Sequence, residues 1–135
     1  MSREIKFRGM DVDGNWHIGN LAILPEDVRH LKKGHYISNE AGLPFAYKVR
    51  PETVGQYTGN KNRGFEGDII SYIEPYRGEH GDIIDYDHLM GMVEWDNERS
   101  GFILRCSNGN EWLEDLMNIT VVGNIHDNPE LIHGT

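Results

Sequence analysis

Runs in which apolar and polar residues alternate recur along this chain of 135 residues. The first run, REIKFR, places Ile5 and Phe7 on one face and charged side chains on the other. Similar runs follow in WHIGNLAIL, HYIS, FAYKVR, TVGQYTG, DIISYI, GMVEWD, GFILRCS and NITVVGNI. A period of two is typical of β-strands with one buried face. The pattern therefore predicts a mainly β fold with minor helix.

Turn signals separate these runs. DGN at residues 13–15 and NG at residues 108–109 tolerate a positive φ and favour tight hairpins. PEDVRHLKK, which begins at Pro25, predicts one short helix or an irregular turn. EWLEDL has apolar residues at near-helical spacing and predicts a single helical turn. Residues 74–88 are mostly polar, which predicts a long and mobile loop.

We expect one domain over residues 1–135, since this length is close to that of a typical domain. Residues 1–58 should form a hairpin-rich N-terminal sheet, packed against a small, bent, barrel-like sheet over residues 59–124. Residues 125–135 should form a tail. Alternation and side-chain size predict a core that contains Trp16, Trp95, Phe102, Leu104 and Val121.

The tail carries apolar residues that a free segment would leave in water. Pro129 should break any regular element. We nevertheless expect residues 123–132 to be ordered, with Leu131 and Ile132 docked onto an apolar surface of their own or a neighbouring chain. Residues 133–135 should fray.

Composition narrows the class of protein. Hydrophobic residues make up 38% and the mean hydropathy is −0.58, as in water-soluble globular proteins. One cysteine excludes an internal disulfide, and the start MSREIKFRGMD holds no apolar run, so we expect a cytoplasmic protein without a membrane partner. The net charge of −9 opposes non-specific binding to nucleic acid. A solvated acidic face is expected from Glu74, Glu79, Asp82, Asp85, Asp87, Glu94, Asp96 and Glu98.

Residues 54–70, VGQYTGNKNRGFEGDII, form the densest glycine cluster in the chain. A phosphate-binding loop would end in Lys and Ser or Thr at the start of a helix, whereas this stretch runs into the strand-like DII. We interpret the stretch as a structural hinge. Gly67-Asp68 should begin a strand through a bulge or a side-chain-capped turn.

Three motifs, REIKFRG, VGQYTG…FEGDII and VVGNIHDNPELI, occur in this order between residues 3 and 132. Together they resemble the YopX family of phage and prophage proteins. In that family the loop between QYTG and EGDI is longer and rich in lysine and glycine, and here it is shortened to NKNRGF. The resemblance implies a phage origin, a fold and self-association, but no reaction.

Three groups of residues are candidates for chemistry or binding. A divalent metal ion could be held by His80, Asp82, Asp85, Asp87 and His88, although their spacing matches no EF-hand loop. Cys106 could act as a nucleophile, but its place in an alternating strand favours a buried thiol. An aromatic and basic surface could be formed by Tyr57, Lys61, Arg63 and Phe65, which would stack nucleic-acid bases if the rings were exposed.

These observations favour a non-enzymatic accessory module that binds itself or a host or phage protein, with no cofactor. The acidic face is the main support, because complementary charge steers the choice of partner. A nucleic-acid-binding module remains an alternative. A small metal-dependent hydrolase or nuclease that uses the His80–His88 segment is another.

Overall fold

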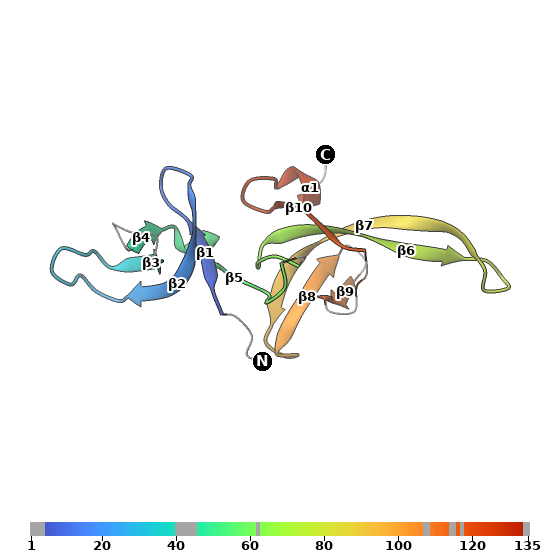
Figure 1. The fold of residues 1–135 in the computed structure, drawn as a ribbon, viewed down its shortest axis with the longest axis horizontal. Helices are drawn as coiled ribbons and strands as arrows, with labels where there is room; N and C mark the ends of the chain where they lie inside the picture. The colour runs from blue at the N-terminus through green and yellow to red at the C-terminus, as the bar shows by residue number, and fades with distance from the viewer. Residues whose placement is uncertain are drawn as a thin grey trace. The chain divides into compact units, whose positions relative to one another are not determined.

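The structure, a computed structural model, describes residues 5–39, 46–61, 63–106, 109–113, 116 and 118–133. The chain divides into two compact units, Met1–Gly59 and Asn60–Thr135, each built around one five-stranded sheet of antiparallel strands (Figure 1). The predicted mainly β fold is confirmed.

The sheet of the first unit has the strand order β4-β3-β2-β1-β5. Its elements are β1 (Phe7–Met10), β2 (Trp16–Leu24), β3 (Gly34–Ser38), β4 (Ala46–Val49), the short 3-10 helix η1 (Pro51–Thr53) and β5 (Gly55–Gln56). Ile37 and Val49 are buried here, while Trp16 is only half-buried beneath the Arg8 guanidinium, which lies 4.7 Å from the indole ring. The turn between β3 and β4 lies outside the described residues.

Asp11 organises the predicted hairpin between β1 and β2. Its Oδ1 accepts hydrogen bonds from the backbone N–H groups of Asp13 at 2.9 Å and Asn15 at 3.0 Å. Its Oδ2 lies 2.7 Å from Nε2 of His17, whose ring stacks on Tyr47 with centroids 3.9 Å apart. The hydrogen bond to His17, followed by the backbone hydrogen bonds, lowers the pKa of Asp11 below its ordinary value of 3.8.

This lowered pKa predicts a pH dependence of the first unit. A carboxylate with a depressed folded-state pKa contributes stability above its unfolded pKa, and that stability is lost as the pH falls through the folded pKa. We expect the Asp11→Asn variant to be less stable than wild type at pH 6 and to approach wild type below pH 3.8. Urea titrations followed through the amide NMR signals of β1 and β2 measure this difference. A gap of equal size at both pH values would contradict it.

The PEDVRHLKK segment forms a turn. Val28 and Leu31 exchange backbone hydrogen bonds of 2.9 and 3.0 Å, which closes a two-residue loop. The irregular turn predicted as an alternative to a short helix is therefore the one observed.

The sheet of the second unit has the strand order β10-β6-β7-β8-β9. Its elements are β6 (Asp68–Arg77), β7 (Ile83–Asp96), β8 (Gly101–Cys106), β9 (Gly109–Trp112), β10 (Thr120–Asn124) and the helix α1 (Glu130–His133). Cys106 pairs with Gly109, as expected for the hairpin predicted at residues 108–109, whose connection itself lies outside the described residues. The helical turn predicted over EWLEDL includes residues 114 and 115, which also lie outside them.

The expectation of a barrel-like second sheet is wrong. In the part of the chain that the structure describes, β10 and β9 stand at opposite edges of the sheet and do not pair with each other. Both are short strands of four or five residues, whereas closure needs edge strands that meet along their length. The sheet is therefore open.

A core cluster of the second unit packs on one face of this sheet and consists of Ile70, Tyr72, Val93, Leu104 and Leu113. Alternation along β6 and β8 places the buried Ile69 and Ile103 on the other face. Leu104 was predicted here correctly. Phe102 packs against the cluster, and Trp95 contacts Phe102 edge-on with ring centroids 5.1 Å apart. Val121 was predicted wrongly, since 39% of it is exposed. It lies on the edge strand β10 beside an irregularity in the pairing with β6, so fewer neighbours cover it.

Asp68 caps the turn that begins β6. Its buried Oδ2 accepts a hydrogen bond from the Phe65 N–H at 2.8 Å, while its own N–H donates to the Phe65 carbonyl at 3.0 Å. Gly64 and Gly67 adopt φ angles of +69° and +89°, which favour glycine. The predicted side-chain-capped turn is confirmed, and the glycines serve backbone geometry rather than a phosphate.

The tail is ordered through residues 123–132, as predicted. Leu131 and Ile132 are half-buried on the short helix α1, which packs against β7. Pro129 does not prevent this helix, because proline fits the start of a helix, where its missing N–H needs no partner. Residues 134 and 135, predicted to fray, lie outside the described part of the chain.

The prediction of a mobile loop over residues 74–88 is wrong. β6 continues to Arg77 and β7 begins at Ile83, so only residues 78–82 form the turn. The polar residues of this segment alternate with β-branched and aromatic ones, which favour strands. Gly81, with φ of +82°, supplies the tight turn, and the Gly78 N–H closes it on the Asp82 carbonyl at 2.8 Å.

Candidate functional site

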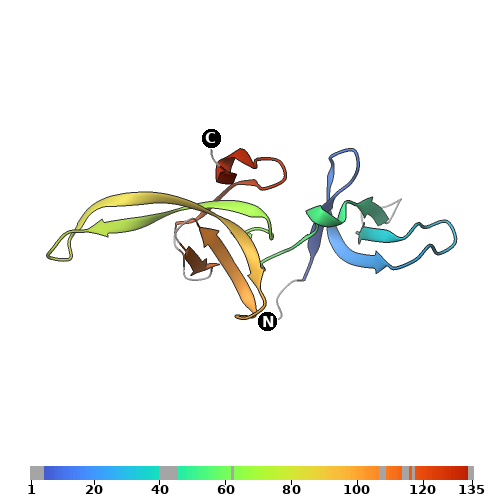
Figure 2. The same ribbon diagram turned by 180° about the vertical axis from the view of Figure 1, so that it is seen from behind.

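The paired strands β6 and β7 extend beyond the rest of their sheet. β10 pairs with β6 only as far as Ser71, and β8 pairs with β7 only from Met92 onward. Residues 73–88, called the acidic arm below, therefore form a two-stranded hairpin that projects from the sheet (Figures 1 and 2). A two-stranded ribbon has no second layer to bury its side chains, so it presents both faces to solvent.

The pairing register gathers negative charge on one face of the arm. Glu74 lies directly opposite Asp87, and Asp85 lies opposite Tyr76 on the same face. Like charges directly opposite each other destabilise a sheet. Arg77 is the one Lys or Arg of the segment, and its guanidinium donates to the Gly81 carbonyl at 2.8 Å. The acidic face is thus organised in a way that a cationic partner would stabilise.

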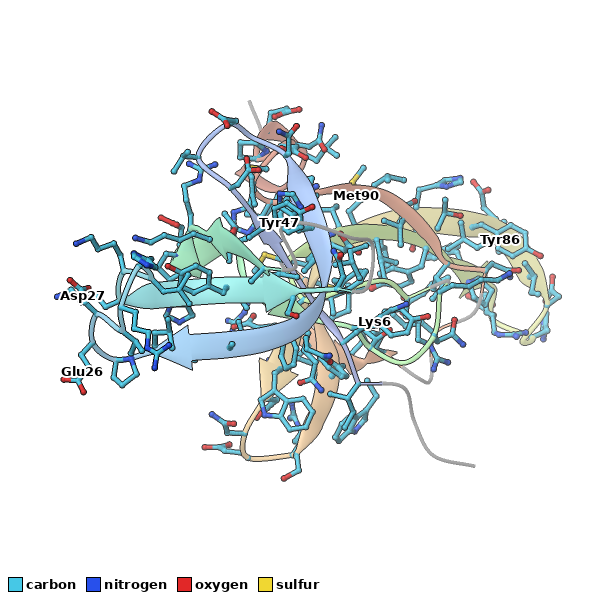
Figure 3. The ribbon with its side chains drawn as sticks, turned by 60° about the vertical axis from the view of Figure 1, so that its left-hand side comes forward. Lys6, Glu26, Asp27, Tyr47, Tyr86 and Met90 are labelled. Carbon is cyan, nitrogen blue, oxygen red and sulfur yellow. The ribbon has the colours of Figure 1, made fainter. Side chains whose placement is uncertain are left out.

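Large apolar side chains accompany this charge. Between 46% and 63% of each of four side chains near the end of the arm is exposed: Tyr76, Ile83, Ile84 and Tyr86. Figure 3 shows Tyr86 out on the arm and Met90 nearer to its base. Several such residues on one projecting hairpin mark an interaction surface more often than isolated exposed apolar residues do.

The arm also presents backbone groups to solvent. Pro75 lies opposite Tyr86, whose N–H donates to its neighbour Asp85 Oδ1 at 2.8 Å instead of to β6. That pair is consequently a non-hydrogen-bonded one, and the alternation of antiparallel pairs makes Ile73 and His88 another. In the described structure no third strand accepts these outward N–H groups, which leaves an edge that another chain could pair with.

The five candidate metal ligands are distributed along this arm. His80 and Asp82 lie in its turn, Asp85 and Asp87 share one face, and alternation along β7 places His88 on the other. Within the described residues no three His, Cys, Asp or Glu side chains come together as a metal-binding group. The geometry gives no support to the metal-dependent hydrolase.

The aromatic and basic candidates are divided between the two units. Tyr57 belongs to the first unit, where the Lys6 ammonium lies 4.5 Å from its ring centroid. Lys61, Arg63 and Phe65 belong to the second, where Lys61 is exposed and the other two are half-buried. Neither unit alone therefore contains all four of the residues predicted to stack nucleic-acid bases.

Cys106 packs against the core of the second unit. Its Sγ lies 3.4 Å from the hydroxyl oxygen of Tyr72, and burial raises the pKa of the thiol. Burial also raises the pKa of Tyr72. A thiol that is held protonated is a poor nucleophile, so Cys106 is a core residue in keeping with its alternating strand.

A groove of about 470 Å³ lies beside the base of the arm. Met90 and Met92 from β7 and Leu131 and Ile132 from α1 give it an apolar lining. Arg105 borders it and forms a bidentate ion pair with Glu94, in which Nη2 donates to Oε1 at 3.1 Å. The groove lies between the tail helix and the sheet.

The model of the family described as YopX protein matches residues 6–133. The chain belongs to the YopX family. The match covers nearly all of the sequence, and it confirms the resemblance drawn from the three motifs of this YopX chain. No curated protein and no solved structure matched it. Among its described residues, no helix has the length and apolar character needed to cross a bilayer.

Proposed function

We propose that this YopX-family chain is a phage- or prophage-derived, cytoplasmic, non-enzymatic module that binds protein through its acidic arm. The observation that carries the proposal is the arm itself. It combines exposed Tyr76, Ile83, Ile84 and Tyr86 with an acidic face and an open strand edge. Protein surfaces of this kind pair with a partner strand through backbone hydrogen bonds and take their specificity from alternate side chains.

The charge of the arm indicates the chemistry of the partner. Five acidic residues and one arginine lie between residues 73 and 88. A partner with lysine or arginine side chains would relieve the repulsion between Glu74 and Asp87, while its apolar side chains would cover Ile84 and Tyr86. Nucleic acid fits less well, because its phosphates would meet these carboxylates.

A photo-crosslinking side chain at Ile84 tests the proposal. The matched control carries the same side chain at Val12, which is 83% exposed on the hairpin of the first unit. We expect the crosslinking side chain at position 84 to become attached to a partner protein, and the same side chain at position 12 not to. The Asp85→Lys and Asp87→Lys pair should lower the yield about tenfold, because it reverses the charge that attracts the partner. The exposed Glu98→Lys and Glu111→Lys pair, which changes the net charge equally, should leave the yield unchanged.

Equal capture from positions 84 and 12, or a yield from position 84 that the Asp85 and Asp87 changes do not lower, would show that the arm is ordinary surface.

A further inference from the structure

Charge is distributed unequally between the two units. Residues 1–59 contain eight Lys and Arg and seven Asp and Glu, whereas residues 60–135 contain five and fifteen. The net charge is therefore +1 for the first unit and −10 for the second. The acidic arm therefore belongs to a unit with a negative net charge, while the other unit of the same chain has a positive net charge.

The end of the β2–β3 hairpin is the basic and apolar surface of the first unit. Residues 26–33 with Ile23 and Lys48 form this basic tip. Its four cations, Arg29, Lys32, Lys33 and Lys48, outnumber its two acids, Glu26 and Asp27, so its net charge is +2. The Lys48 side chain crosses Gly34 at its base. Between 45% and 57% of each of Ile23, Val28 and Leu31 is exposed. The tip therefore combines cations with exposed apolar side chains, and the arm combines acids with exposed apolar side chains.

The tip is held in a fixed conformation. Asp27 Oδ1 accepts a hydrogen bond from the Lys33 N–H at 2.8 Å, and its Oδ2 lies 3.5 Å from the Lys32 ammonium, so this acid is engaged within the tip. The Tyr36 hydroxyl donates to the Lys32 carbonyl at 2.7 Å. Figure 3 labels Glu26 and Asp27 at this end of the hairpin.

Arg29 occupies the first position of the two-residue turn with φ of +57°, where glycine would be unstrained. Strained backbone at a surface turn is a pointer to function when the side chain it carries is charged and exposed. The turn therefore carries an exposed cation on a left-handed backbone position.

We propose that the basic tip of one copy of this chain binds the acidic arm of a second copy, in a head-to-tail interface. The inference rests on the proposed role of the arm and names its partner. Arg29, Lys32 and Lys33 would face Glu74, Asp85 and Asp87. Tyr76, which lies on the same face of the arm as these acids, would be covered by apolar residues of the tip. Such an interface joins two different surfaces, so it leaves a free tip and a free arm at the ends of each dimer.

A second copy fits the tip better than other anions do. Phosphate backbones would satisfy its cations but offer no apolar surface to Ile23, Val28 and Leu31. The arm supplies acids and apolar side chains together.

A charge-swap experiment tests this pairing by sedimentation velocity in about 0.15 M salt, where long-range electrostatics are screened beyond roughly 8 Å. Wild type should sediment as species heavier than the 15.5 kDa monomer. The arm variant, Asp85→Lys with Asp87→Lys, and the tip variant, Lys32→Glu with Lys33→Glu, should each sediment as monomers. Mixed in equal amounts, the two should assemble again, because each supplies the surface that the other now complements.

The control variant, Glu98→Lys with Glu111→Lys, should assemble like wild type. Circular dichroism confirms that every variant is folded, and neutral Asp85→Asn with Asp87→Asn replaces the arm variant if it is not. Any one of three results overturns the inference. These are a wild type that sediments as a monomer, a charge-reversed variant that still assembles, and a mixture of the two variants that stays monomeric. Charge-dependent capture of a different protein from Ile84 by monomeric wild type would overturn it while leaving the proposed function intact.

Discussion

Replacing Leu104 by alanine is expected to cost about 2–5 kcal/mol of unfolding free energy, the range for removal of a large side chain from a packed core. Leu104 is 0% exposed and lies at the centre of the core of the second unit, beside Val93 and Ile70. The packing around it is tight, since a Cβ added to Gly91 would come within 2.6 Å of its Cγ. Urea unfolding followed by Trp95 and Trp112 fluorescence measures the change.

Val121→Ala is the matched control, because the sequence predicts that both Val121 and Leu104 lie in the core. The exposed position of Val121 on an edge strand predicts a loss below about 1 kcal/mol. Equal losses for the two variants would show that the core of the second unit is not where the structure places it.

Gly19→Ala is expected to destabilise the first unit by about 1–3 kcal/mol or more, the range for overpacking a filled site. Gly19 lies in β2 opposite Phe7, and a Cβ at this position would overlap the backbone carbonyl oxygen of Ser38. A carbonyl within a strand cannot rotate away as a side chain can, so β2 and β3 would have to separate. Loss of the β3 amide NMR signals at lower urea than in wild type would report this.

The exposed neighbour Asn20 supplies a control for that experiment. Asn20→Ala removes a side chain that points to solvent, and its effect should stay within about 0.5 kcal/mol. A Gly19→Ala protein as stable as Asn20→Ala would mean that β2 and β3 approach less closely than described.

The local features of the fold could be predicted because neighbouring residues determine them. Alternation identified the strands, and Gly14 with its flanking residues marked the first hairpin. The acid cap of the β6 turn followed from Gly67 next to Asp68. Such features depend on backbone conformation and on side chains within a few residues.

Features that depend on distant neighbours could not be predicted. Whether Val121 is buried depends on what covers β10, and whether the sheet closes depends on how its edge strands meet. The sequence predicts a loop in place of the arm because acidic residues dominate the segment. The weaker strand signal is the alternation of Ile84 and Tyr86 with Asp85 and Asp87, next to a glycine turn. Once the segment is recognised as a strand, the adjacent positions of Asp87 and His88 place them on opposite faces.

Amide hydrogen exchange of the arm tests the central claim most directly, which is that residues 73–88 form a preformed hairpin offered for binding. The pairing predicts slow exchange at Glu74 and Asp87, whose N–H groups point at the opposite strand, and fast exchange at Ile73, Tyr86 and His88, whose N–H groups point outward. Uniformly fast exchange at all five positions would contradict the account, because a mobile loop presents neither the acidic face nor the strand edge on which the proposed binding depends.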